Sequence, residues 1–306
     1  DELVDIDART YIPPGEDEGF FELRIAAKDS PEVEILPKDI TFIIDASSSI
    51  LQRKLNSTID GLIQVIRNDL RPEDHFNIVV FRDNPTEFQP RRVPATPENK
   101  AAAYEFLDDM ESHGETDVYN ALRPVIQSTP REGVPGIIVV MSDGRPTAGV
   151  RDGRTIINAI SAENERRNTI FAFGGGRTVN SYLLDLLAYR NRGESRVAPS
   201  IEDIETVLPA FLDRLESPVL VDLRADYGRI DEATVVPKEV PDFYKGKIVR
   251  VYGRFDPEKD REFSVRLTGQ AGARSKELVF KANLAEAPQG DAEIAHLDMP
   301  IPLQQY

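Results

Sequence analysis

The chain contains no cysteine, and this absence removes several classes of protein at once. Disulfide bonds and thiolate metal sites are excluded, so the fold must depend on packing, hydrogen bonds and bound ions. A cytosolic protein and a bacterial exported protein both fit this composition.

Positive charge is also scarce. The sequence has 37 Lys and Arg against 53 Asp and Glu, which gives a formal net charge of −16. Binding of nucleic acid normally depends on clustered Lys and Arg that neutralise phosphates. We therefore expect no nucleic-acid partner.

Long hydrophobic runs are missing as well. No stretch of about eighteen apolar residues is present, so we expect no membrane insertion within this chain. The sequence begins at Asp1 rather than at a methionine, which predicts a processed or truncated piece. A signal peptide or membrane anchor would then lie outside it.

Histidine is rare too, and the three that occur, His75, His113 and His296, are scattered along the chain. No pairing of a nucleophile with a base is recognisable. The sequence therefore predicts a protein that is not an enzyme.

The residues that are present predict a globular chain with an α/β region. Its 306 residues are 40% hydrophobic, enough for real cores. From Ile40 to about Leu215, short apolar strands alternate with amphipathic helices, the pattern of a doubly wound, mostly parallel sheet flanked by helices. Strands are predicted at 40–45, 76–82, 136–142, 169–174 and 195–197, and helices at 51–70, 98–111, 117–128, 154–168, 181–188 and 204–215.

Outside this region the hydrophobic period changes to two, which is typical of half-buried antiparallel strands. Such strands are predicted at 21–25, 219–225, 248–255, 263–267 and 277–282, about five in all, which suits a small antiparallel β-sandwich. The first is too short to fold alone, so we expect it to pair with the later strands. This divides the chain into the first strand or strands of the sandwich (1–36), the α/β domain (37–216) and the remainder of the sandwich (217–306).

Side chains with oxygen atoms lie directly after two of the predicted strands and in one predicted loop. Asp45, Ser47 and Ser49 come directly after the apolar run 40–44, Thr116 lies in a second loop, and Asp143 follows the strand 136–142. A hard divalent cation prefers such oxygen ligands. Taken alone, however, the first loop favours helix capping over metal binding, because Ser and Asp are favoured N-cap residues.

These five residues, in this order, resemble the metal-ion-dependent adhesion site (MIDAS) of the von Willebrand factor type A domain. The resemblance covers roughly residues 36–216. Continuation of the chain through 216–222 and 243–249 is similar to inter-alpha-trypsin inhibitor heavy chains and their bacterial relatives. It implies that Asp45, Ser47, Ser49, Thr116 and Asp143 are the metal ligands, and that the metal is a divalent cation, Mg²⁺ first, with Mn²⁺ or Ca²⁺ as alternatives.

The resemblance further implies an adhesion or protein-interaction module whose cation binds an Asp or Glu carboxylate of a protein partner, in a secreted or cell-surface bacterial protein. The alternatives are an intracellular assembly adaptor of an ATP-driven complex and a metal-dependent hydrolase. Covalent linkage to matrix is not expected, because the chain end at 299–306 shows no attachment motif.

Neighbouring residues have plainer interpretations. We expect Asp117 to interact with a helix N-terminus rather than with the metal, and His113 to be a surface loop residue. Arg145 either orients an acidic ligand or is solvated. The run Gly174-Gly175-Gly176 lacks the lysine of a phosphate-binding loop and predicts a turn.

Overall fold

The computed structural model describes residues 4–27, 34–82, 84–215, 217–260, 262–290 and 294. The chain divides into two compact units, one of Pro37–Glu216 and one of Asp1–Leu36 with Ser217–Tyr306. We call the first the α/β unit and the second the β unit. The α/β unit is thus inserted in the sequence of the β unit.

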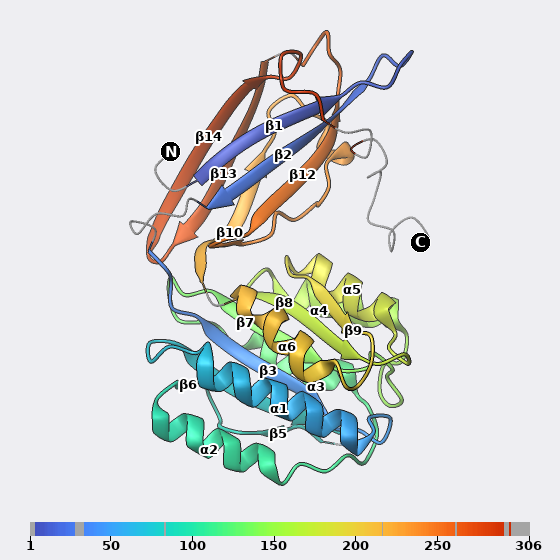
Figure 1. The fold of residues 1–306 in the computed structure, drawn as a ribbon, viewed down its shortest axis with the longest axis vertical. Coiled ribbons are helices and arrows are strands. Elements are labelled where there is room, and N and C mark those ends of the chain that lie inside the picture. The colour runs from blue at the N-terminus through green and yellow to red at the C-terminus, as the bar shows by residue number, and fades with distance from the viewer. Residues whose placement is uncertain are drawn as a thin grey trace. The chain divides into compact units, whose positions relative to one another are not determined.

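The α/β unit is built on one sheet with strand order β5-β4-β3-β7-β8-β9 (Figure 1). Neighbours among β3, β4, β7, β8 and β9 are parallel, whereas the short β5 and β6 pair antiparallel with β4. The bounds are β3 Asp39–Asp45, β4 His75–Phe81, β5 Thr86–Glu87, β6 Val93–Pro94, β7 Gly136–Met141, β8 Asn168–Gly175 and β9 Ser195–Ala198. Every residue of β3 and β7 is buried, which explains their continuous apolar runs.

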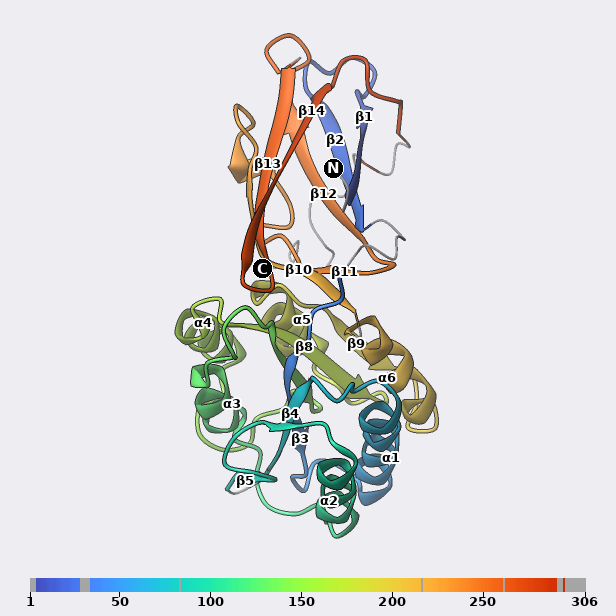
Figure 2. The same cartoon turned by 90° about the vertical axis from the view of Figure 1, so that its left-hand side faces the viewer.

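Helices cover both faces of this sheet (Figures 1 and 2). Helices α1 and α6 pack together on one face, while α4 packs with α3 and α5 on the other. Their bounds are α1 Gln52–Asn68, α2 Pro97–Asp108, α3 Val118–Gln127, α4 Gly153–Asn164, α5 Ser181–Arg190 and α6 Ile204–Leu212, with a 3-10 turn η1 at Asp213–Leu215. One face of α1 is buried, as expected for an amphipathic helix, with Leu55, Leu62 and Ile66 almost inaccessible to solvent.

Strand β3 marks the point where the winding of the sheet reverses. It lies between β4 and β7, so the chain leaves β3 for one side of the sheet and later builds β7 on the other. In open α/β sheets, ligands bind at the carboxyl ends of the strands beside such a switch point. Asp45 ends β3, and Asp143 follows β7 by two residues.

The β unit contains two antiparallel sheets. One has the order β1-β2-β12 (Val4–Tyr11, Gly19–Ala27, Ile248–Phe255) and the other β11-β10-β13-β14 (Phe243–Tyr244, Pro218–Asp226, Glu262–Ala271, Arg274–Asn283), with a 3-10 turn η2 at Glu232–Thr234. One core joins both sheets: the rings of Phe21 and Phe263 lie 5.2 Å apart, among the buried Leu23, Val251 and Leu267.

The fold class predicted from the sequence is confirmed, and so is the pairing of the N-terminal strand with the later ones, because β2 pairs with β12 along its length. The prediction of about five sandwich strands is wrong, since β1 and β11 were missed. Strand β1 presents small residues such as Ala8 and Thr10 to the interior, and β11 has only two residues, too few for a period. The helix predicted to reach Asn168 ends at Asn164, because Glu165 and Arg166 adopt positive φ.

Candidate functional site

Three loops meet at the carboxyl edge of the sheet in the α/β unit, and hydrogen bonds of backbone and hydroxyl groups hold them together. Ser48 in the first loop donates from N and Oγ to the carbonyl of Gly114 in the second, at 2.9 and 2.8 Å. The second loop is tied to the third in both directions, because Thr116 N donates to Thr147 Oγ1 at 2.8 Å and Thr147 N donates to Thr116 O at 2.9 Å. The three loops are therefore held together as one hydrogen-bonded structure.

Consecutive hydrogen bonds between hydroxyl groups connect the residues at the centre of these loops. Thr116 Oγ1 donates to Ser47 Oγ at 2.6 Å, and Ser47 Oγ donates to Asp45 Oδ1 at 2.6 Å. Ser49 Oγ lies 3.0 Å from Ser47 Oγ. Because the single Ser47 proton is given to Asp45, Ser49 is the donor in that last bond. Four of the five residues expected to be ligands are thus hydrogen-bonded to one another.

Asp45 is the buried end of this series of hydrogen bonds. Its side chain is 2% exposed, Oδ1 also accepts from Ser47 N at 3.0 Å, and Oδ2 accepts from Ser142 Oγ at 2.6 Å. Burial raises the pKa of Asp45 above its ordinary value, and the charge of Asp143 adds to that rise. The hydrogen bonds from Ser142 and Ser47 oppose it. A buried carboxylate beside a second one is a place where a cation would be stabilised.

Asp143, the fifth expected ligand, is 2% exposed and stands at the start of the third loop. Its Oδ1 accepts from Arg145 N at 3.0 Å, and its carbonyl accepts from Asn180 N at 2.8 Å. Gly144 adopts φ +68°, and a Cβ there would come within 2.8 Å of the carbonyl of Asn180. The tight turn after Asp143 therefore requires a glycine, which fixes the direction of the loop.

The first loop does not cap the following helix. Helix α1 begins at Gln52, and its N-cap residue is Leu51, whose side chain makes no capping hydrogen bond. The helix-capping interpretation of Asp45, Ser47 and Ser49 is therefore wrong, and their oxygens are used inside the loop cluster instead.

The donor set suits a hard divalent cation. It offers two carboxylates and three hydroxyl groups, all oxygen donors. Within the part of the chain that the structure describes, no group of three or more His, Cys, Asp or Glu side chains is arranged to hold a metal. A cation at this site would therefore depend on hydroxyl ligands as much as on carboxylates. We call Asp45, Ser47, Ser49, Thr116 and Asp143 the loop cluster.

Neighbouring residues take the plainer roles. Asp117 is the N-cap of α3 and accepts from Asn120 N at 3.1 Å, as predicted. His113 and Arg145 are exposed. Gly174 and Gly175 are the last residues of β8, where a Cβ on Gly175 would lie 2.4 Å from the Ile204 side chain, and Gly176 follows the strand with φ +81°. His75 begins β4, at the opposite edge of the sheet from the loop cluster, and His296 lies outside the described residues.

Sequence reasoning missed two residues at the site. Ser142 holds the second oxygen of Asp45, and its signal was its place between the strand and Asp143. Lys54 is buried in the first turn of α1 near both aspartates. Lys54 lies on the same buried face of α1 as Thr58, Gly61 and Val65. A lysine at a position of that face was the feature of the sequence that could have identified it.

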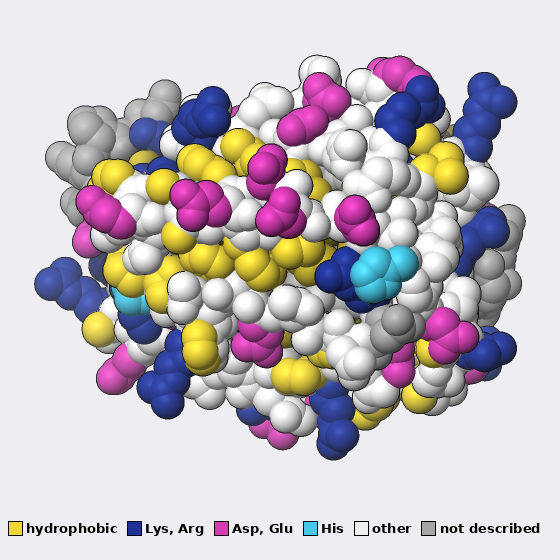
Figure 3. Space-filling view, turned by 90° about the horizontal axis from the view of Figure 1, so that it is seen from below, with side chains coloured by type: hydrophobic (Ala, Val, Ile, Leu, Met, Phe, Trp, Pro, Cys, Tyr) yellow, Lys and Arg dark blue, Asp and Glu magenta, His cyan; other side chains and the backbone are white. Residues whose placement is uncertain are grey.

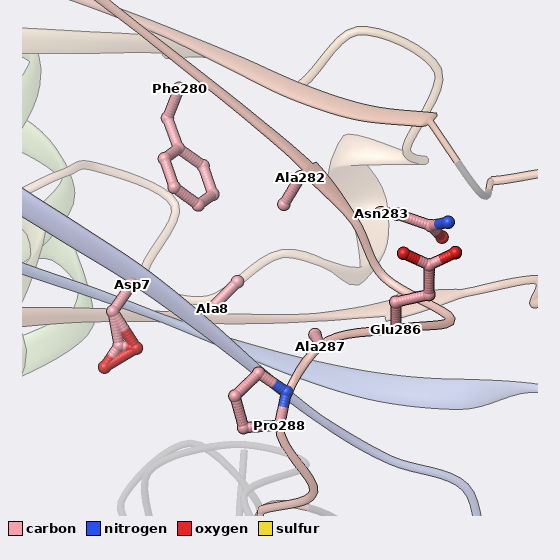
Figure 4. A pocket seen from close by; sticks show the side chains of 8 residues that line it. All are labelled: Asp7, Ala8, Phe280, Ala282, Asn283, Glu286, Ala287 and Pro288. Carbon is pink, nitrogen blue, oxygen red and sulfur yellow. The ribbon is translucent and has the colours of Figure 1, made fainter.

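Other surfaces offer less. In the view of Figure 3, Lys and Arg side chains stand singly and mostly toward the border, while hydrophobic side chains gather in a central band with acidic ones beside it. In the β unit, a hollow of about 340 Å³ lies between β1 and β14, with Ala8 on one side and Phe280 and Ala282 on the other (Figure 4). Two carboxylates, Asp7 and Glu286, stand apart at its border, so it gathers no comparable set of ligands.

Comparison with known proteins gives one family match. The family described as von Willebrand factor type A domain matches residues 38–197, more than half of the chain. Human inter-alpha-trypsin inhibitor heavy chain H4 is 27% identical over 259 residues, a match that covers 82% of this chain and 28% of that protein. The chain thus spans less than a third of the length of this relative.

Solved structures share the fold. A von Willebrand factor type A protein from Catenulispora acidiphila has a TM-score of 0.73 at 13% identity and covers 96% of this chain, with 75% of its own chain matched. The ArnB paralog VWA2 from Sulfolobus acidocaldarius has a TM-score of 0.63 at 16% identity, with 97% and 79% covered. Both likenesses extend beyond the α/β unit, because they include nearly all of this chain.

Proposed function

Because this chain belongs to the von Willebrand factor type A domain family, as its sequence predicted, we propose that its loop cluster binds a divalent cation and, through it, a carboxylate of a protein partner. Domains of this family are generally protein-interaction or adhesion modules. Binding of a metal and of an acidic ligand is what we propose for this chain in particular. The single observation that carries it is the hydrogen-bonded assembly of Asp45, Ser47, Ser49 and Thr116 beside Asp143 at the switch point of the sheet.

The charges of the loop cluster favour Mg²⁺, with Mn²⁺ or Ca²⁺ as alternatives. Asp45 and Asp143 together carry the two negative charges that neutralise one divalent cation, and the hydroxyl groups add none. A small octahedral cation commonly binds one or two carboxylates and keeps water in its remaining positions. When bound, the cation would supply an electrophilic centre that accepts an oxygen ligand from outside the chain.

The residues of the chain prepare this site. Ser142 holds Asp45 from one side and Ser47 holds it from the other, so the carboxylate is oriented before any ligand arrives. The protons of Thr116 and Ser49 now point toward Ser47 Oγ. Cation binding would require these protons to rotate away, so that the oxygen lone pairs face the ion.

We propose binding rather than catalysis as the task of this site. A metal-activated water would need a positioned base, and the polar partners of Asp45 are the serines that orient it. We also propose that the chain acts outside the cell or at its surface, as the resemblance to inter-alpha-trypsin inhibitor heavy chains implies. In the part of the chain that the structure describes, no helix is long and apolar enough to cross a membrane.

The test is a calorimetric titration of Mg²⁺ into chelator-treated protein. We expect one site in the wild type and an affinity at least ~10-fold weaker in Thr116→Val, which removes a hydroxyl while keeping the shape. Thr58→Val is the matched control, because Thr58 is also buried but its hydroxyl donates within α1, to Lys54 O at 2.9 Å. Equal effects of the two variants would count against the loop cluster.

The partner is tested separately by capture on immobilised protein, in Mg²⁺ against chelator, with Thr116→Val in parallel. Capture by the wild type in Mg²⁺, lost in chelator and in the variant, is the expected result. Capture that survives chelator would place the binding surface elsewhere.

A further inference from the structure

Lys54 is a buried lysine without a partner, and the function proposed above gives it no task. Its side chain is 7% exposed, and its Nζ is buried and makes no hydrogen bond among the described residues. A buried ammonium group without a partner is costly, so such a residue calls for a reason.

The position of Lys54 supplies one. The residue lies in the first turn of α1, and its Cε comes within 3.8 Å of a Cβ built on Gly175, at the end of β8. The side chain thus extends along the carboxyl edge of the sheet, where the loop cluster lies. The charged groups that act on it are Asp143 and Asp45, which favour its charged form, and Arg145, which opposes it. Burial lowers the pKa of Lys54, and the two aspartates work against that lowering.

The same chain shows what a structural buried lysine looks like. Lys38 is 2% exposed, forms an ion pair with Asp74 at 2.8 Å, and donates to the carbonyl of Asp69 at 3.3 Å. Lys54 makes no such pair, although two carboxylates are near. The oxygens of Asp45 are bonded to Ser47 and Ser142 instead. Lys54 therefore contributes its charge to the site without forming a hydrogen bond to the carboxylate oxygens that would bind the cation.

Resting on the function proposed above, we propose that Lys54 is a fixed positive charge that weakens binding of the cation alone and makes the loaded site require an anionic partner group. The charge count supports this role. With Lys54, the site carries −1 when empty, +1 with a divalent cation and 0 once a partner carboxylate has joined. Without Lys54, the values are −2, 0 and −1, so the cation alone would neutralise the site and no net positive charge would remain to attract a carboxylate.

The cation and the carboxylate attract each other directly, so each binds better once the other is present. Lys54 shifts the balance between them, because its charge weakens binding of the cation alone and strengthens binding of the carboxylate. Exposed Arg145 adds a further positive charge, but solvent screens it more than the buried Lys54.

The test measures Mn²⁺ binding by electron paramagnetic resonance in the wild type, Lys54→Met and Arg53→Met. Arg53 is the matched control because it is adjacent in α1 and carries the same charge, but its side chain is 70% exposed in an ion pair with Glu202. We expect Lys54→Met to bind Mn²⁺ alone about 10-fold more tightly than the wild type, and Arg53→Met to bind within about twofold of it. Replacing chloride by acetate at equal ionic strength should tighten Mn²⁺ binding in the wild type more than in Lys54→Met.

The outcomes separate the two proposals. If the wild type binds Mn²⁺ and a folded Lys54→Met binds it no more tightly, the role of Lys54 is overturned while the cation site stands. If no variant binds Mn²⁺, the function proposed above fails with it. Should Lys54→Met not unfold cooperatively, Lys54→Gln is the second neutral variant and decides by the same comparison. Lys54→Arg, which keeps the charge, must behave like the wild type.

Discussion

Asp143→Asn is the sharpest perturbation of the loop cluster, because it removes one of its two charges and little else. The amide oxygen of Asn can still accept the bond that Arg145 N gives to Oδ1 at 3.0 Å. The variant also relieves the repulsion with Asp45, whose pKa is raised by the charge of Asp143. We therefore expect its unfolding free energy in chelator to equal or slightly exceed that of the wild type, within about 1 kcal/mol. Asp45→Ala is a poorer probe, since it leaves two serine hydroxyls and an amide without their acceptor, at a cost of about 1–3 kcal/mol.

The effect of Mg²⁺ should separate the proteins. A cation present at about 100 times its dissociation constant stabilises the folded state by about 2.7 kcal/mol. At roughly 2–4 °C per kcal/mol for a unit of this size, the wild-type melting temperature should rise by about 5–10 °C. In Asp143→Asn most of that rise should vanish at the same Mg²⁺ concentration.

Differential scanning calorimetry in Mg²⁺ and in chelator measures both quantities. Asp117→Asn is the matched control: it changes the charge by the same amount in the neighbouring loop, but Asp117 caps α3. This control should keep the full Mg²⁺ effect. The reasoning is refuted if Asp143→Asn keeps the full effect too, or if it is much less stable than the wild type in chelator, because Asp143 would then be a structural residue.

Three further predictions follow from the contacts. Ser142→Ala removes the 2.6 Å bond to Asp45 Oδ2 and should weaken Mg²⁺ binding about 10- to 100-fold in calorimetry; an unchanged affinity would show that Asp45 needs no such support. A chain of residues 37–216 should unfold cooperatively and keep the Mg²⁺ effect on its melting temperature, since it is a compact unit; failure to fold would show dependence on the β unit. Burial raises the pKa of Tyr252, the donor to Glu22 Oε1 that links β12 to β2, from 10.0 to about 12. Between these values the unfolded chain ionises first, so wild-type stability in urea unfolding should fall as pH rises, and Tyr252→Phe should fall less.

The sequence predicted the α/β unit well because its strands are buried on both faces and its helices are amphipathic. Strands buried on both faces are visible in the sequence as continuous apolar runs. Amphipathic helices are visible as apolar residues spaced three and four apart. The β unit was harder. Strand β1 buries small side chains that carry a weak hydrophobic signal. Its partner β2 pairs with β12, and the whole α/β unit separates these two strands in the sequence.

The loop cluster could be predicted as a set of residue types at strand ends, but its internal order could not. Which hydroxyl donates to which oxygen depends on how three loops cross, as in the bond from Thr116 to Ser47. The absence of a side-chain cap on α1 is likewise a matter of backbone geometry. Lys54 was missed although its place on the buried face of α1 was a signal, because a lysine on such a face can also extend its charged end into solvent, and tertiary packing decides between the two.

The central claim is that the loop cluster holds a divalent cation, and crystals grown with Mn²⁺ test it most directly. Data collected near the manganese absorption edge locate the ion by its anomalous signal without any assumption about ligands. The account predicts one strong peak, at about 2.0–2.6 Å from side-chain oxygens of the loop cluster. Strong peaks only at other places, or none at the carboxyl ends of β3 and β7, would contradict it.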